Sequence, residues 1–264
     1  MAIIGALPGH QRFLLVNWAQ NLIGAGIRHR RLEREILHVS DGVLHTRGDS
    51  GSTMVIYERI SGFLDPADVE RFCGLIQDQS DLFTETKGKA GLGPKYRVIN
   101  GNQIRERLLP IAELGENRVM PEAERLFEQR LQFLRSPRRS MRIQRYAQKT
   151  HEFRWHRDAH DYVALVTLRN TNRGETQVIS PALSRFLKYL LYPFYAVPQV
   201  FSIFPYESIV SEPGDLLLMR GSAVLHRGIT MMEDGERTLM VYTFDAHGKK
   251  PSVFRDRIAR FLNY

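Results

Sequence analysis

The chain has 264 residues, of which 43% are hydrophobic and 25% charged, a composition that suits one large globular domain or two small ones. Its single cysteine, Cys73, excludes an internal disulfide and fits a reducing compartment, so we expect a cytoplasmic protein. The formal net charge of +8 is spread along the chain without a known nucleic-acid-binding module, so no nucleic-acid partner is expected.

The first part of the sequence looks like an appendage. A helix is predicted over about residues 10–37, and a link rich in Gly, Ser and Asp follows up to residue 52. The apolar segment 13–27 within it is interrupted by polar residues and followed by arginines. We expect it to pack on the protein or on a partner chain, with peripheral contact to a membrane surface as the less favoured alternative. No window of about 20 uncharged apolar residues exists, so a spanning helix is not expected.

Helices are predicted to dominate the next part, up to about residue 135. Asp65 caps a helix that starts with Pro66 and continues to about Gln79. A second amphipathic helix is predicted over 121–134, because a proline and glutamates stand at its start and apolar residues recur at helical spacing. The other elements predicted here are a strand over 54–60, a loop over 87–94 and a short strand over 96–99.

From residue 141 onward, short runs rich in Val, Ile, Leu and Tyr alternate with turn signals, which is typical of a double-sheet β fold. The predicted strands are 141–146, 152–158, 161–169, 175–179, 208–211, 215–220, 222–229 and 237–244. The sequence therefore predicts an α+β protein, with a helical N-terminal half packed on a β-sandwich or jelly roll.

A helical insertion at about 181–205 breaks the rhythm of the strands. Ser184 is the predicted cap of its short helix. The insertion is interpreted either as a lid over a site or as a helix that only covers core.

The stretch from Arg154 to Asp158 carries two groups that can bind a metal. In an extended backbone successive side chains point to opposite faces, so His156 and Asp158 are predicted to point the same way. His160 shares that face, but it lies about 13 Å from His156 along an extended strand, too far to share one ion unless the chain turns. His160 is therefore the second choice as a ligand.

A third metal-binding group and a buried cation come later. His226 ends an apolar run, and Arg237 opens a strand that is otherwise apolar. An arginine buried there is costly without an anionic partner. The sequence thus places a histidine and an arginine, eleven positions apart, on strands expected to be antiparallel neighbours.

These residues resemble the Fe(II)/2-oxoglutarate-dependent oxygenases, whose pattern is His-x-Asp, then a distant His, then an Arg roughly ten residues on. His156, Asp158, His226 and Arg237 match that pattern in order. Three flanking segments match as well: Gln144-Arg145-Tyr146, Gly174-Glu175-Thr176 and Pro213-Gly214-Asp215. The first of them is similar to a strand of the prolyl-hydroxylase-like branch. The resemblance covers about residues 54–246.

The resemblance implies a double-stranded β-helix, or jelly roll, over residues 53–264. It further implies that His156, Asp158 and His226 bind Fe(II), and that Arg237 binds the far carboxylate of 2-oxoglutarate. Many members have a hydroxyl two positions after the arginine, where this chain has Leu239, so Tyr146 or Thr243 is expected to supply one.

The implied activity is that of a dioxygenase that uses O2 and 2-oxoglutarate and releases succinate and carbon dioxide. It would hydroxylate or desaturate an unactivated C–H bond of a small molecule. Three nearby basic residues, Arg142, Arg154 and Arg157, could attract an anionic substrate.

Two alternatives stay open. One is a catalytically silent jelly-roll module that binds a partner or membrane surface through its basic N-terminal region. The other is a cupin-like enzyme that uses another metal or none, in which Arg237 would have no carboxylate to bind.

Overall fold

The computed structural model describes residues 36–40, 43–47, 53–86, 96–147, 152–171, 173–191, 198–229 and 235–249. The chain divides into two compact units, Met1–Leu37 and His38–Tyr264. The predicted helix over 10–37 lies outside the described residues except at its end, where Ile36 and Leu37 belong to a strand instead. The predicted boundary at residues 52 and 53 stays a prediction, as does the loop over 87–94, which also lies outside the described residues.

Among the described residues, the larger of two antiparallel sheets has ten strands. Their order is β1-β2-β3-β12-β9-β14-β7-β5-β4, and β6 also pairs with β14. The bounds are β1 Ile36–Ser40, β2 Val43–Arg47, β3 Thr53–Ile60, β4 Thr84–Glu85, β5 Arg97–Asn100, β6 Leu131–Phe133, β7 Met141–Tyr146, β9 Tyr162–Asn170, β12 Leu216–Met219 and β14 Arg237–Ala246.

The smaller sheet has four strands in the order β11-β10-β13-β8. Their bounds are β8 Glu152–His156, β10 Glu175–Ile179, β11 Tyr206–Val210 and β13 His226–Ile229. From β7 to β14 the chain passes back and forth between the two sheets, and only β10 and β11 follow each other within one sheet. The strand pattern read from the sequence after residue 141 is confirmed in number and order.

The large sheet is apolar on both faces. In β12, Leu216 and Leu218 point to one core cluster while Leu217 and Met219 point to another. This explains the uninterrupted apolar run of that strand, because a strand buried on both faces loses the alternation of polar and apolar residues. The inner cluster also includes Val178 of β10 and Ile209 of β11, so the two sheets pack face to face.

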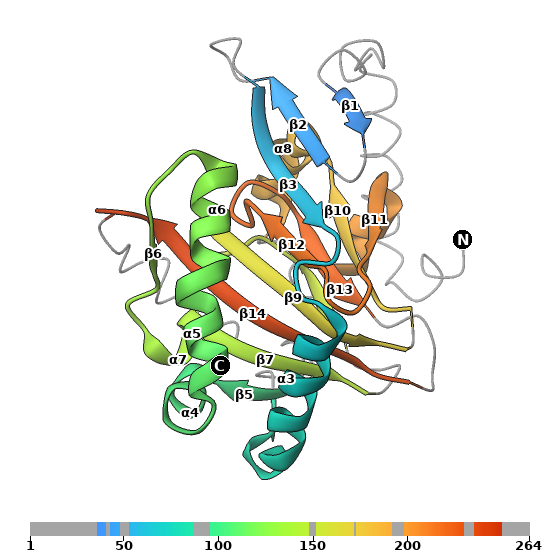
Figure 1. The fold of residues 1–264 in the computed structure, drawn as a ribbon. Coiled ribbons are helices and arrows are strands. Elements are labelled where there is room, and N and C mark those ends of the chain that lie inside the picture. The colour runs from blue at the N-terminus through green and yellow to red at the C-terminus, as the bar shows by residue number, and fades with distance from the viewer. Residues whose placement is uncertain are drawn as a thin grey trace, which may run out of the picture. The chain divides into compact units, whose positions relative to one another are not determined.

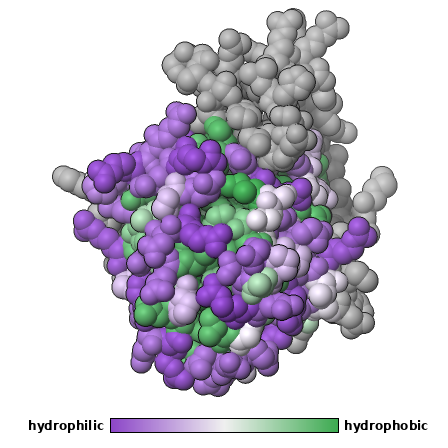
Figure 2. Space-filling model, viewed as in Figure 1, coloured by the Kyte–Doolittle hydropathy of each residue, from purple (hydrophilic) through white to green (hydrophobic). Residues whose placement is uncertain are grey.

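Helices cover the outer face of the large sheet (Figure 1). Their bounds are α3 Pro66–Asp78, α4 Gly101–Arg107, α5 Leu109–Leu114, α6 Met120–Phe127 and α7 Pro137–Ser140, with a five-residue π-helical turn, Gly115–Val119, joining α5 to α6. The cap predicted for α3 is confirmed, since Asp65 accepts a hydrogen bond of 2.7 Å from the backbone N–H of Asp68. Hydrophilic side chains make up most of the face that these helices present in Figure 2. The described part of the chain is therefore an α+β fold, as predicted.

The helix predicted over 121–134 is too long. Helix α6 ends at Phe127, where Glu128 takes a left-handed conformation with φ 50°. Leu131–Phe133 then forms strand β6, which pairs with β14. Tertiary strand pairing therefore overrides the helical spacing of the last apolar residues.

The insertion forms helix α8 (Pro181–Leu191) and a 3-10 turn, Pro198–Ile203. Ser184 is not the cap, because the helix begins three residues earlier; its hydroxyl instead donates to Ile179 O and accepts from Leu225 N, each at 2.9 Å. Leu187 and Phe201 pack in a third apolar cluster with Trp155 of β8, whose side chain points away from that of His156. The described part of the insertion is thus a cover for the outer face of the small sheet and no lid over its inner face.

No helix among the described residues is long and apolar enough to cross a membrane.

Candidate metal centre

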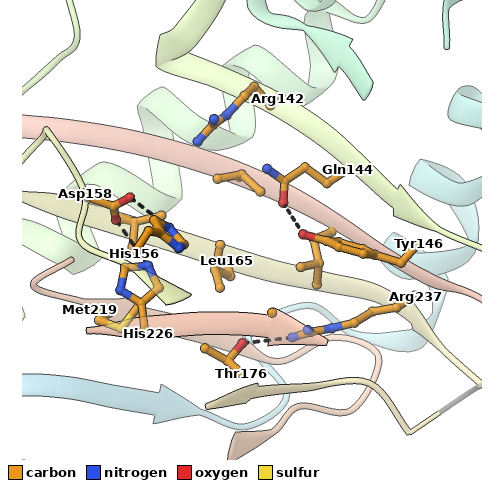
Figure 3. Close-up of a pocket in the computed structure, with 14 residues that line it drawn as sticks. Arg142, Gln144, Tyr146, His156, Asp158, Leu165, Thr176, Met219, His226 and Arg237 are labelled. Carbon is orange, nitrogen blue, oxygen red and sulfur yellow. Dashed lines mark hydrogen bonds and ion pairs between the residues drawn. The ribbon is translucent and has the colours of Figure 1, made fainter. Parts of the chain in front are cut away.

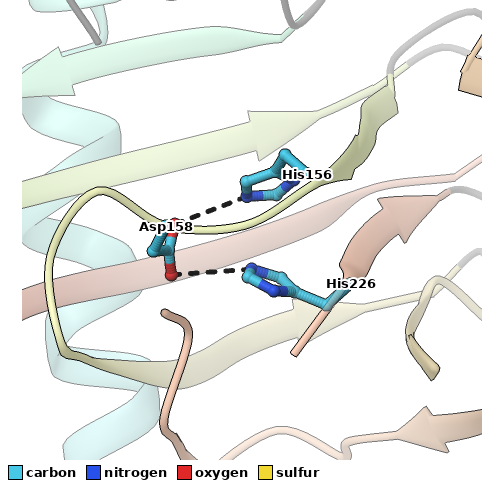
Figure 4. A group of neighbouring side chains, drawn as sticks. All are labelled: His156, Asp158 and His226. Carbon is cyan, nitrogen blue, oxygen red and sulfur yellow. Dashed lines mark ion pairs between the residues drawn. The ribbon is translucent and has the colours of Figure 1, made fainter. Parts of the chain in front are cut away.

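Three side chains converge at one end of the gap between the sheets (Figure 4). His156 is the last residue of β8 and His226 the first of β13, and the two are direct partners across these neighbouring strands. Asp158 follows two residues later, just before the bend at residues 159 and 160. One donor atom from each residue lies within 4.8 Å of the others. The predicted ligand set is therefore brought together in space.

The route by which Asp158 reaches this group differs from the prediction. Strand β8 ends at His156, so the strand predicted over 152–158 is two residues too long. The chain bends at residues 159 and 160, and the backbone N–H of Asp158 donates to Gly221 O at 3.1 Å. Gly221 also leaves room for the carboxylate, because a Cβ placed there would lie 1.9 Å from Asp158 Oδ2. The loop before β13 thus positions the carboxylate.

The backbone fixes which nitrogen of each imidazole faces the centre. Nδ1 of His156 lies 2.6 Å from Arg154 O, and Nδ1 of His226 lies 3.3 Å from Val224 O. A carbonyl oxygen only accepts, so each Nδ1 carries the proton, and each Nε2 presents a lone pair to the centre. These Nε2 atoms lie 3.5 and 3.6 Å from the carboxylate oxygens of Asp158.

The protonation states of the centre suit a cation. Burial, reinforced by the neighbouring His156, lowers the pKa of His226 to about 3. Burial opposes ionisation of Asp158, but the surrounding histidines outweigh it and hold the pKa of this carboxyl well below its usual range. Metals bind neutral imidazole and ionised carboxylate, and these are the states that the two shifts favour at His226 and Asp158. Two imidazoles and a carboxylate on one face are the ligands that non-haem Fe(II) takes in oxygenases.

A pocket extends from this centre between the sheets (Figure 3). Its lining residues are Arg142, Gln144, Tyr146, His156, Asp158, Val163, Leu165, Thr176, Met219, His226, Gly228, Arg237, Leu239 and Val241. This one cavity therefore contains five of the six residues predicted for the site: His156, Asp158, His226, Arg237 and Tyr146.

Arg237 forms the far end of the pocket and is only 1% exposed. Its Nη1 donates to Glu175 O at 2.9 Å and its Nη2 to Thr176 Oγ1 at 3.0 Å. Its Nε is buried and has no hydrogen-bond partner in the described part of the chain. Burial lowers the pKa of Arg237, and Tyr146 and Glu175 oppose that effect. A buried guanidinium with an unused donor is suited to an anionic ligand.

Tyr146 lies beside Arg237, since the two residues pair across β7 and β14. Burial raises the pKa of Tyr146 to about 12, although the charges of Arg237 and Arg142 act against this rise. The phenol is therefore neutral, and it donates to Gln144 Oε1 at 3.1 Å. Gln144 in turn donates to the hydroxyl of Tyr96 at 3.2 Å.

Thr243 does not line the pocket. Its hydroxyl donates to Arg139 O at 2.7 Å, so it is engaged in holding α7 against β14. The hydroxyl beside Arg237 belongs to Thr176 on the small sheet. The sequence marks Thr176 only as part of a matching strand. Its alternation with the inward-facing Val178 is the signal that its side chain points into the gap.

Of the three basic residues expected near the site, only Arg142 lines the pocket. Arg157 donates instead to the carbonyl of Ser222. His160, the second choice as a ligand, comes close because the chain turns: its Nε2 lies 3.3 Å from Asp158 Oδ2. It stands outside the group of three whose donor atoms converge.

No protein-family model matches the sequence, and no curated protein matches it. Solved structures match the fold. A non-heme alpha-ketoglutarate-dependent carbocyclase, SnoK from nogalamycin biosynthesis, is 15% identical, with 77% of this chain and 85% of that chain covered and a TM-score of 0.57. HygX from Streptomyces hygroscopicus, solved with nickel and 2-oxoglutarate bound, is 16% identical, with 74% and 84% covered and a TM-score of 0.56.

The non-heme alpha-ketoglutarate-dependent epimerase SnoN, also from nogalamycin biosynthesis, is 15% identical, with 76% and 83% covered and a TM-score of 0.53. The chain has the fold of the Fe(II)/2-oxoglutarate-dependent oxygenases. This confirms the superfamily resemblance at the level of the fold. Assignment to the prolyl-hydroxylase-like branch of these oxygenases stays a prediction.

Proposed function

We propose that the protein is an Fe(II)- and 2-oxoglutarate-dependent dioxygenase that oxidises an unactivated C–H bond of a small molecule, with release of succinate and carbon dioxide. The observation that carries this proposal is one pocket with a three-residue metal-ligand face at one end and the buried guanidinium of Arg237 at the other. We also propose that the two sheets form the jelly roll implied by the sequence, because strands β7 to β14 alternate between them.

The spacing of the two ends suits the cosubstrate. His226 pairs with Val178, and two residues further along the same strands Gly228 pairs with Thr176, the hydroxyl partner of Arg237. Two strand residues span about 7 Å, which is the length scale of a five-carbon dicarboxylate. In this proposal His156, Asp158 and His226 would hold the metal at the oxoacid end of 2-oxoglutarate, and Arg237 would hold its far carboxylate.

Thr176 completes the carboxylate subsite. Its oxygen accepts from Arg237, so its own proton is available to a carboxylate. Tyr146 is the second neutral hydroxyl at that end; its proton, which is donated to Gln144 Oε1 in this structure, would turn to the carboxylate when the cosubstrate binds. We therefore assign the anchoring role to Arg237, Thr176 and Tyr146, and leave Thr243 out.

When bound, the iron would supply the oxygen chemistry, and this chain's residues supply binding and orientation. Burial excludes water from Arg237 and strengthens its attraction for a carboxylate. Val163, Leu165 and Val241 give the middle of the pocket apolar walls.

The substrate is proposed to be a small molecule. Structures of HygX and SnoN were solved with hygromycin B and nogalamycin RO bound, respectively. Hydroxylation is the first outcome that we expect for this chain, with desaturation as the second, although related structures include an epimerase and a carbocyclase. A silent binding module is less well supported, because it gives no reason for the converging ligands and the buried arginine. We keep the cytoplasm as the expected compartment.

The test is turnover of the cosubstrate. Protein loaded with Fe(II) and 2-oxoglutarate under anaerobic conditions is expected to form succinate when oxygen is admitted. His156→Ala and Asp158→Ala should abolish this turnover, whereas His247→Ala, at an exposed histidine outside the pocket, should leave it unchanged. Full turnover in either ligand variant would overturn the assignment.

A further inference from the structure

A third histidine lies against the carboxylate of the metal centre. His160 is 5% exposed, and its Nε2 lies 3.3 Å from Asp158 Oδ2. Neither of its ring nitrogens makes a well-aligned hydrogen bond within the described ranges. Asp158 is therefore the polar group that the structure offers to this buried ring, and a buried polar ring without a partner is costly.

Two hydrogen bonds donated by backbone N–H groups hold the segment that carries Asp158 and His160. Asp158 N–H donates to Gly221 O at 3.1 Å, and Asp161 N–H donates to the carboxylate of Asp245 at 3.2 Å. His160 lies between these two fixed points. These two contacts fix the backbone on either side of His160, so its ring faces Asp158.

His160 differs from the two ligand histidines in where its proton can go. The protons of His156 and His226 are held at Nδ1 by backbone carbonyls, so their Nε2 atoms cannot donate to Asp158. Nδ1 of His160 has no such acceptor in the part of the chain that the structure describes. Its proton is best placed on Nε2, where the carboxylate is the acceptor. Among the three imidazoles around Asp158, His160 is thus the one able to donate.

We propose that His160 is a positioning residue, which donates its Nε2–H to Asp158 Oδ2 and leaves Oδ1 to bind the metal. This proposal rests on the metal centre of the proposed function. Partners of ligating groups orient the ligand, and their removal typically lowers metal affinity about 10- to 100-fold. The contact predicts that the carboxylate binds through one oxygen and that its second oxygen is held against rotation.

The experiment measures Co(II) binding to the metal-free protein and the absorption spectrum of the Co(II) form. Three proteins are compared: the parent, His160→Leu and His160→Gln. His160→Leu fills the space of the ring without a donor, and His160→Gln restores an N–H. We expect His160→Leu to lower Co(II) affinity about 10- to 100-fold and to alter the spectrum, with His160→Gln within about threefold of the parent.

The thermal midpoint of the metal-free protein separates positioning from a structural role. It should fall in His160→Leu, which leaves Oδ2 of Asp158 without a donor, and stay near that of the parent in His160→Gln, which restores one. Equal Co(II) affinity in His160→Leu and the parent would overturn the proposal, as would an equal loss in both variants accompanied by a lower midpoint. Absence of Co(II) binding in the parent would instead overturn the metal centre itself.

Discussion

Gly221 gives the most direct access to the geometry of the centre. A Cβ at this position would lie 1.9 Å from Oδ2 and 2.7 Å from Cγ of Asp158, and real Cβ contacts are almost never below 3.0 Å. In Gly221→Ala the carboxylate must therefore move by about 1.1 Å, the difference between 3.0 and 1.9 Å. Ligand distances in a metal site hold to within about 0.2 Å, so a shift of this size removes Asp158 as a ligand. We expect metal affinity to fall at least about 100-fold.

The assay is calorimetry of Co(II) binding to metal-free protein. Gly74→Ala is the matched control, because Gly74 lies in α3 with nothing within 4 Å of its added Cβ, and neither glycine has the positive φ that disfavours alanine. Gly74→Ala should bind Co(II) as the parent does. Unchanged affinity in Gly221→Ala, with the fold intact by circular dichroism, would refute the placement of Asp158 against this loop.

Further predictions concern the anchor and the histidines. Arg237→Lys keeps the charge but loses the planar guanidinium that can donate two hydrogen bonds to one carboxylate. The KM for 2-oxoglutarate should therefore rise about 10- to 100-fold in steady-state assays. Tyr146→Phe should raise the same KM about tenfold with little change in kcat, because it loses one donor. Thr176→Val should raise that KM, whereas Thr243→Val should leave it unchanged and lower the free energy of unfolding by about 1 kcal/mol; the reverse pattern would restore Thr243 to the site. The pKa of His226 is lowered to about 3 in the folded chain but is 6.5 without burial, so the free energy of unfolding of the metal-free protein should fall as pH drops from about 6.5 toward 3. Urea unfolding across that range should show a smaller loss in His226→Gln, and an identical loss would count against the buried neutral imidazole.

The strands and the His-x-Asp pair could be predicted from sequence because they depend on local patterns, whereas the roles of His226 and Arg237 came from the resemblance to a known family. Runs of alternating or uniformly apolar residues marked β7, β9, β10 and β14, and the spacing of the His-x-Asp pair pointed to a metal. These signals lie within a few residues of the features that they predict.

The predictions that were wrong depend on contacts between residues that are far apart in the sequence. Thr243 and Arg237 point to the same face of β14, because side chains alternate along a strand. They are six residues apart, however, which is about 20 Å along the strand. The hydroxyl beside Arg237 belongs to Thr176, which lies in the other sheet. The position of Asp158 depends on a hydrogen bond to Gly221, and the end of α6 depends on the pairing of β6 with β14. No local pattern contains either contact.

The proposed placement of metal and cosubstrate can be seen in a crystal structure of the protein grown anaerobically with Mn(II) and 2-oxoglutarate. The anomalous signal of manganese should lie among His156, Asp158 and His226, with one carboxylate of 2-oxoglutarate against Arg237. A metal bound elsewhere, or a cosubstrate that does not reach Arg237, would contradict the account.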